Sequence, residues 1–157
     1  MIIYARNYTP EARDIYASLL SAMQANGIRP KVCGSLYDNF ITDGLATAND
    51  MLPLEPVLTS SSARAMLSVG GDGTFLESAK KALMTDIPIL GVNKGRLGFL
   101  SDLQSSQIPW AVGELIRGSY RVANLDVLSV YAGDQREPLD YALNEFSVSK
   151  CDNSSML

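Results

Sequence analysis

The sequence of 157 residues contains no histidine and only two cysteines, Cys33 and Cys151. Without histidine, this chain supplies no imidazole base, so any acid–base chemistry has to use carboxylates, lysine, tyrosine or water. The two cysteines lie far apart and form no Cys-x-x-Cys pair, so neither a zinc site nor a disulfide scaffold is expected. Free cysteines are typical of a reducing compartment, and we therefore expect a cytoplasmic protein.

The sequence is also poor in positive charge. It has 13 basic and 17 acidic residues, a net charge of −4, which argues against a protein that binds nucleic acid through a basic surface. It contains no apolar run of the length that a membrane span needs, and its N-terminus does not resemble a signal peptide, so we expect no membrane partner. The 46% of hydrophobic residues are enough for a globular core. In a chain of negative net charge, an anionic small ligand would have to be held by local geometry.

Short apolar runs alternate with helical patterns through the first 121 residues. Strands are expected at residues 2–5, 30–33, 66–69 and 87–92, and helices at residues 9–27, 74–83 and 108–117, with short helix and loop over residues 34–62. Alternation of this kind is typical of a parallel sheet covered by helices on both faces. The expected fold class is therefore α/β, with a Rossmann-like sheet in a first domain of residues 1–121.

The pattern changes from helical to β near residue 122. Residues 125–130 and 141–148 are expected to be strands, with a polar turn over residues 133–138. Because two strands alone are marginal in water, we interpret residues 122–157 as the beginning of an all-β domain that is incomplete here.

The segment Gly70-Gly71-Asp72-Gly73-Thr74 carries the clearest chemistry. It joins an expected strand to an expected helix, and its glycines let backbone NH groups approach phosphate oxygens at the positive end of that helix. A carboxylate would repel phosphate, so Asp72 is interpreted as the proton acceptor for an attacking hydroxyl or as a ligand of magnesium. The alternative is that Asp72 only caps the helix while the glycines satisfy the geometry of the turn.

Two sequence motifs resemble those of known kinases. The string at residues 70–74 is similar to the shared motif of a superfamily that includes NAD kinases, diacylglycerol kinases and sphingosine kinases. The segment Gly91-Val92-Asn93-Lys94-Gly95-Arg96-Leu97-Gly98-Phe99-Leu100 resembles the Gly-x-Asn-x-Gly-x-Leu-Gly-Phe-Leu segment of NAD kinases, from which lipid kinases usually diverge. Its glycines would let this loop fold against residues 70–74 at the carboxyl ends of neighbouring strands. Lys94 and Arg96 can equally be solvated surface charges.

The resemblance to NAD kinases implies a reaction and a set of site residues. The reaction is phosphoryl transfer from ATP, or polyphosphate, to the 2'-hydroxyl of the adenosine ribose of NAD, with Mg²⁺ or another divalent cation, in an enzyme that is expected to be a homo-oligomer. Asp72 would be the catalytic residue, and the residues expected to contact NAD or ATP are Gly71, Gly73, Thr74, Asn144, Glu145 and Ser155. The family's later motif Thr-Pro-Thr-Gly-Ser-Thr-Ala-Tyr is absent, so we interpret the chain as the N-terminal half of such an enzyme.

Two other functions stay open at this point. A lipid kinase of the diacylglycerol type would share the glycine turn, although residues 91–100 and the pair Asn144-Glu145 argue against it. A nucleotide-binding fragment without catalysis is the second alternative. The sequence does not decide between ATP and polyphosphate as donor, or between NAD and NADH as acceptor.

Overall fold

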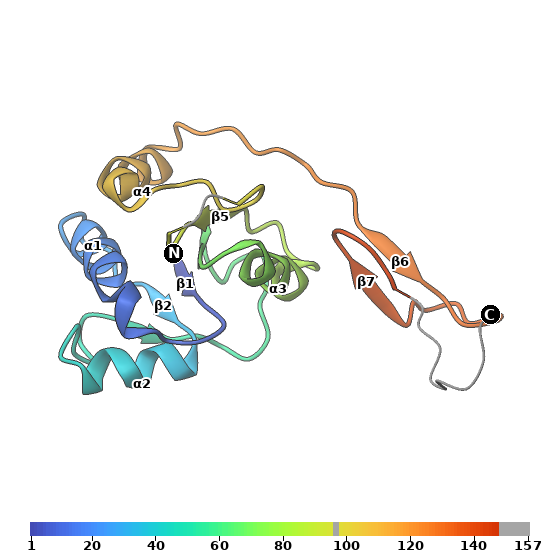
Figure 1. Cartoon of the computed structure of the whole chain (residues 1–157), viewed down its shortest axis with the longest axis horizontal. Helices are drawn as coiled ribbons and strands as arrows, with labels where there is room; N and C mark the ends of the chain where they lie inside the picture. The colour runs from blue at the N-terminus through green and yellow to red at the C-terminus, as the bar shows by residue number, and fades with distance from the viewer. Residues whose placement is uncertain (96–97, 148–157) are drawn as a thin grey trace. The chain divides into compact units, whose positions relative to one another are not determined.

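The first part of the chain contains a parallel five-stranded sheet with the strand order β3-β2-β1-β4-β5, seen in a computed structural model that describes residues 1–95 and 98–147 (Figure 1). The strands are β1 (Ile2–Tyr4), β2 (Lys31–Val32), β3 (Leu52–Pro53), β4 (Met66–Val69) and β5 (Ile89–Val92). Every residue of β1 and β4 is buried, which explains why both segments are mainly apolar, with Ser68 as the polar residue of β4. The register places Ile2 beside both Lys31 and Met66, so β1 lies at the centre of the sheet.

Four α-helices and two 3₁₀ turns complete this part of the chain. They are η1 (Pro10–Ala12), α1 (Arg13–Gln24), α2 (Gly34–Thr42), α3 (Asp72–Ala82), η2 (Ser105–Gln107) and α4 (Ile108–Arg117). Side chains of α1, α2 and α4 share one core with one face of the sheet, which includes Ile3 and Leu67. The opposite face, which includes Ile2 and Met66, packs against α3 through Ala82. The expected α/β class, with helices on both faces of a parallel sheet, is therefore confirmed (Figure 1).

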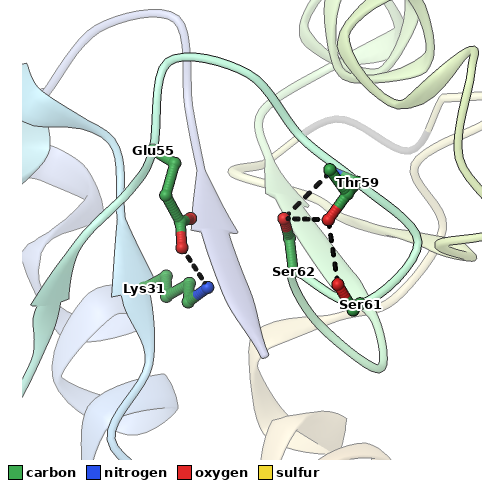
Figure 2. A network of polar contacts seen from close by, with 5 residues as sticks. All are labelled: Lys31, Glu55, Thr59, Ser61 and Ser62. Carbon is green, nitrogen blue, oxygen red and sulfur yellow. Dashed lines mark hydrogen bonds and ion pairs between the residues drawn. The ribbon is translucent and has the colours of Figure 1, made fainter.

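The connection from β3 to β4 differs from the other connections in this sheet, because residues 54–65 contain no helix. A turn at residues 59–62 holds part of this segment. The Thr59 NH group donates to Ser62 Oγ at 3.0 Å, and the Thr59 and Ser61 hydroxyl oxygens lie 3.0 Å apart (Figure 2). On this face, Leu54, Leu58 and Ala63 of the irregular segment pack against the core that includes Ile2 and Tyr4 of β1, and α3 contacts β4, β5 and, through Tyr4, β1.

Residues 124–157 form a second structural unit, and residues 1–123 form the first. The described part of the second unit contains β6 (Leu128–Val130) and β7 (Asp140–Ala142), which pair antiparallel with Leu128 opposite Ala142. The intervening turn includes Gly133 at a φ of 55°, a left-handed conformation that favours glycine. The assignment of residues 1–121 and 122–157 to two functional domains remains a prediction.

Several expected boundaries were wrong by a few residues. Helix α3 begins at Asp72 and not at Thr74, since the Thr74 and Phe75 NH groups already donate to the Gly71 carbonyl. The strand expected over residues 141–148 is confined to Asp140–Ala142, and residues 143–147 are not extended in a sheet, while residue 148 lies outside the described residues. In the part of the chain that the structure describes, no helix combines the length and apolar character needed to cross a bilayer.

Candidate functional site

The glycine turn lies where β4 ends and α3 begins, as the sequence predicted. Gly71 is the N-cap of α3 and Asp72 is its first residue. A Cβ atom on Gly70 would overlap the Thr74 side chain, so the tight turn requires glycine at this position. At Gly71 and Gly73 the space around a Cβ position is open, and both residues are exposed. The first NH groups of a helix have no partner within the helix, and here they are accessible to a ligand.

The Asp72 carboxylate connects this turn to the loop that follows β5. Its two oxygens accept hydrogen bonds from the backbone NH groups of Leu100, at 2.9 Å, and Phe99, at 3.0 Å. A Cβ atom on Gly98 would overlap the same carboxylate, so only glycine allows this approach. The expectation that the loop after β5 folds against the glycine turn is confirmed.

These contacts lower the pKa of Asp72. Hydrogen bonds from the backbone NH groups of Leu100 and Phe99 stabilise the carboxylate and hold the pKa of Asp72 below its ordinary value. Its position in the first turn of α3 also favours a negative charge. Asp72 is therefore ionised near neutral pH and can accept a proton or contribute one oxygen to a cation. Its hydrogen bonds run to the loop, which argues against a residue that merely caps its own helix.

Contacts of Asn93 and Gly91 fix the path of the loop after β5. The Asn93 side-chain oxygen accepts a hydrogen bond from the Gly95 NH group at 2.6 Å, and the Asn93 NH group donates to the Leu103 carbonyl at 2.9 Å. Gly91 has no room for a side chain, because a Cβ atom there would overlap the Leu100 carbonyl. The sequence motif contained Gly91 and Asn93 but gave no reason for either residue, and the structure provides that reason.

A pair of buried serines forms a polar contact between α3 and β4 next to the glycine turn. Ser78 Oγ on α3 lies 2.8 Å from Ser68 Oγ on β4 and 3.0 Å from the Thr74 carbonyl oxygen. Both side chains are fully buried. They join the first turns of α3 to the strand that precedes it. The sequence analysis missed this pair, because two serines ten residues apart give no signal without the fold.

The remaining predicted residues lie elsewhere. Asn144 and Glu145 are exposed and follow β7 in the second unit, which is described by itself. Ser155 and Arg96 lie outside the described residues. Lys94 is an exposed residue whose ammonium donates to the Thr9 hydroxyl at 3.3 Å, in keeping with a surface charge. The structure thus brings together residues 70–74 and 98–101, and it leaves the roles of the other residues as predictions.

The described residues contain no group of three His, Cys, Asp or Glu side chains that could hold a metal ion by themselves. A magnesium ion is often bound through one or two carboxylates and the phosphates of the substrate. A single ionised carboxylate at an exposed glycine turn fits that second arrangement. The donor phosphates would then supply most of the ligands, and Asp72 would supply one.

Comparison with known proteins agrees with this geometry. A family model described as the ATP-NAD kinase N-terminal domain matches residues 21–120. The chain is 31% identical to an NAD kinase of Bacteroides fragilis over 99% of its own length and 53% of that protein. It is 42% identical to an NAD kinase of Cytophaga hutchinsonii over 59% of its length and 32% of that protein.

A solved structure shares the fold. The crystal structure of yeast NADH kinase complexed with NADH matches with a TM-score of 0.67 and 17% identity, over 90% of this chain and 45% of that chain. The chain spans about half the length of these relatives. The match of the family model over more than half of the sequence shows that this chain belongs to the NAD kinase family, through that family's N-terminal domain.

Proposed function

We propose that the full-length protein transfers the terminal phosphoryl group of ATP, or of polyphosphate, to the 2'-hydroxyl of the adenosine ribose of NAD and so forms NADP. The observation that carries the proposal is an ionised carboxylate, Asp72, held at an exposed glycine turn by two backbone NH groups of the neighbouring loop. A phosphoryl-transfer enzyme has to position its reactants and stabilise charge, and this arrangement contains groups for both tasks.

The chain's own residues have separate roles in the proposed reaction. Asp72 accepts the proton of the attacking hydroxyl, and Gly71, Gly73 and Thr74 form the phosphate site at the start of α3, with the backbone NH groups of the two glycines as donors. Asn144, Glu145 and Ser155 position the adenosine part of NAD, because amide, carboxylate and hydroxyl groups can bond its hydroxyls. A divalent cation, when bound, would be held mainly by the donor phosphates with Asp72 as its ligand from the chain, the alternative role of this carboxylate, and it would supply neutralisation of charge. We expect a cytoplasmic homo-oligomer for the full-length enzyme.

The central test replaces Asp72 by asparagine in the complete gene product. A general base contributes roughly 10²- to 10⁴-fold to a rate, so Asp72→Asn should lower kcat for NADP formation by about that factor. NAD binding, measured by calorimetry, should change little, because the side chain keeps its size. Asp38→Asn is the matched control, since Asp38 is an exposed residue of α2 outside the glycine turn.

Three outcomes separate the possible functions. NADP formation that is lost only in Asp72→Asn supports the proposal, and equal turnover of both variants contradicts the role of Asp72. Binding of NAD without turnover in the complete gene product would indicate a nucleotide-binding protein without catalysis. Assays with ATP and polyphosphate, and with NAD and NADH, identify the preferred donor and acceptor.

A further inference from the structure

Buried polar side chains gather on the face of the sheet that packs against α3. Among the described residues they are, tyrosine apart, Ser68, Ser78, Asn93 and Ser101. The register places Ser68 beside Gly91 and Val69 beside Val92. Val69 and Val92 belong to the core of the opposite face, and successive side chains of a strand alternate between faces. Gly91 and Asn93 therefore share the face of Ser68, whose hydroxyl contacts Ser78 of α3.

Two of these side chains pair with each other, and the other two each hold an unpaired atom. Ser68 and Ser78 are joined by the hydroxyl contact of 2.8 Å. Asn93 Nδ2 and Ser101 Oγ have no hydrogen-bond partner among the residues that the structure describes. The exposed fractions of Asn93 and Ser101 are 7% and 0%, so bulk solvent does not pair these atoms either. An unpaired buried donor costs free energy, and native proteins satisfy nearly all such groups with protein atoms or with ordered water.

The two unpaired atoms belong to neighbouring points at the end of β5. A Cβ atom on Gly91 would lie 2.8 Å from Ser101 Oγ and 2.3 Å from the Leu100 carbonyl oxygen. Asn93 follows two residues later on the same face, roughly 6.6 Å further along the strand. The Gly95 NH group donates to Asn93 Oδ1, which fixes the orientation of the amide and leaves Nδ2 as the unpaired end. This spacing suits one bridging molecule between the amide and the hydroxyl.

The chemistry of the two groups selects the ligand. Asn93 Nδ2 can only donate a hydrogen bond, which excludes a metal cation. An anion is disfavoured, because the same loop already holds the Asp72 carboxylate. Water can accept from Asn93 Nδ2 and donate to Ser101 Oγ and to the Leu100 carbonyl oxygen. Three hydrogen bonds of this kind are typical of an internal water molecule.

We propose that Asn93 and Ser101 bind one internal water molecule, which joins the loop around Asp72 to the end of β5. Phe99 and Leu100, which donate to the Asp72 carboxylate, directly precede Ser101 in the chain. The water thus positions the loop through Ser101. Its importance for catalysis rests on the function proposed above, whereas its presence does not.

The first experiment is a crystal structure of the 157-residue chain at high resolution. We expect density for one water molecule at hydrogen-bond distance, roughly 2.7–3.2 Å, from both Asn93 Nδ2 and Ser101 Oγ. A direct bond between the two side chains, or no density between them, would overturn the proposal.

The second experiment uses the sign of a stability change. If Ser101 Oγ is unpaired, Ser101→Ala removes a buried polar atom and should raise the urea midpoint of unfolding. If the hydroxyl is bonded to the proposed water, the same substitution breaks that bond and should lower the midpoint, which is the result we expect. Ser106→Ala makes the same chemical change at an exposed residue and should leave the midpoint unchanged. An unchanged or raised midpoint in Ser101→Ala would contradict the bridge.

The positioning of the loop has its own spectroscopic signature. Hydrogen bonds to the Asp72 carboxylate move the NMR signals of the Phe99 and Leu100 NH protons downfield. Ser101→Ala should move both signals upfield, and Ser106→Ala should move neither. Unchanged signals in Ser101→Ala would show that the water does not position this loop.

Kinetics of the complete gene product then separate this site from the proposed reaction. Ser101→Ala should lower kcat for NADP formation and leave the KM for NAD unchanged, because the loop acts through Asp72. An unchanged kcat together with shifted NH signals would contradict only the role proposed for Asp72. NADP formation by a protein whose crystals show no bridging water would contradict only this site.

Discussion

Asp72 owes its properties to one neighbouring glycine. Any side chain at Gly98 would overlap the Asp72 carboxylate. The backbone NH groups of the next two residues, Phe99 and Leu100, donate hydrogen bonds to this carboxylate. The glycine therefore lets the loop hold the carboxylate of the proposed base in position and lower its pKa. Seen from the sequence, Asp72 and Gly98 were separate members of two motifs, and only the parallel arrangement of β4 and β5 brings them into contact.

Gly98→Ala should raise the pKa of Asp72 toward its ordinary value, because the new methyl group displaces the carboxylate from both NH donors. Carbon-detected NMR titration of the Asp72 carboxyl measures this directly. Because the pKa of Asp72 is lowered in the folded state, this carboxylate stabilises the fold at pH values above its ordinary pKa of 3.8. That contribution is lost as the pH falls through the folded-state pKa. Gly95→Ala is the matched control in the same loop, since open space surrounds its Cβ position. Equal pKa values in both variants would contradict the proposed dependence.

Tyr4 gives a prediction at the opposite end of the pH scale. Burial, together with the negative charge of Glu77, raises the pKa of Tyr4 to about 12 from 10.0. Because the folded state disfavours the phenolate, this contribution to stability is complete below pH 10 and is lost as the pH rises toward 12. Tyr4→Phe should flatten the decline of the free energy of unfolding over that interval, as measured by urea denaturation. An unchanged slope would show that Tyr4 does not titrate as described.

At the scale of elements, the sequence predicted what depends on local pattern. The strand at residues 66–69 and the helix at residues 108–117 have the expected bounds, because the strand ends at two glycines and the helix ends at one. Within residues 34–62 the sequence predicted short helix and loop without bounds, and the structure shows helix α2 and the short strand β3 there. Strand β3 gives no sequence signal, because it has two residues that are both exposed. Its pairing with β2 is a tertiary contact that no local pattern reports.

Helix α4 offers a test in which the same substitution has opposite effects. Gly118 ends α4 with a φ of 71°, so Gly118→Ala should lower the free energy of unfolding by about 1 kcal/mol. Gly113 lies inside α4, where alanine is the better helix former, and only the flexible Arg117 side chain lies near its Cβ position. Gly113→Ala should raise the free energy of unfolding by about 0.5–1 kcal/mol. Changes of the same sign in both variants, measured by urea denaturation, would contradict this account of the helix.

At the scale of the whole molecule, the two structural units differ in what holds them together. All buried side chains among the described residues lie between Ile2 and Leu115, and most of the apolar ones belong to the two cores that cover the faces of the sheet. The described residues of the second unit contribute one two-stranded ribbon and no buried side chain. An isolated ribbon of two strands is marginally stable in water. The stability of the chain therefore resides in its first unit.

A chain shortened to residues 1–123 should consequently unfold with the same free energy as the 157-residue chain, within about 0.5 kcal/mol, because surface changes away from the core have effects of this size. A peptide of residues 124–157 should lack the circular dichroism of a folded sheet. As a positive control for the measurement, Phe40→Ala in the shortened chain should cost about 3–5 kcal/mol, since Phe40 is fully buried in the core. A loss of several kcal/mol on shortening would show instead that the second unit stabilises the first, and the α/β unit could then not be treated as an independently folding domain.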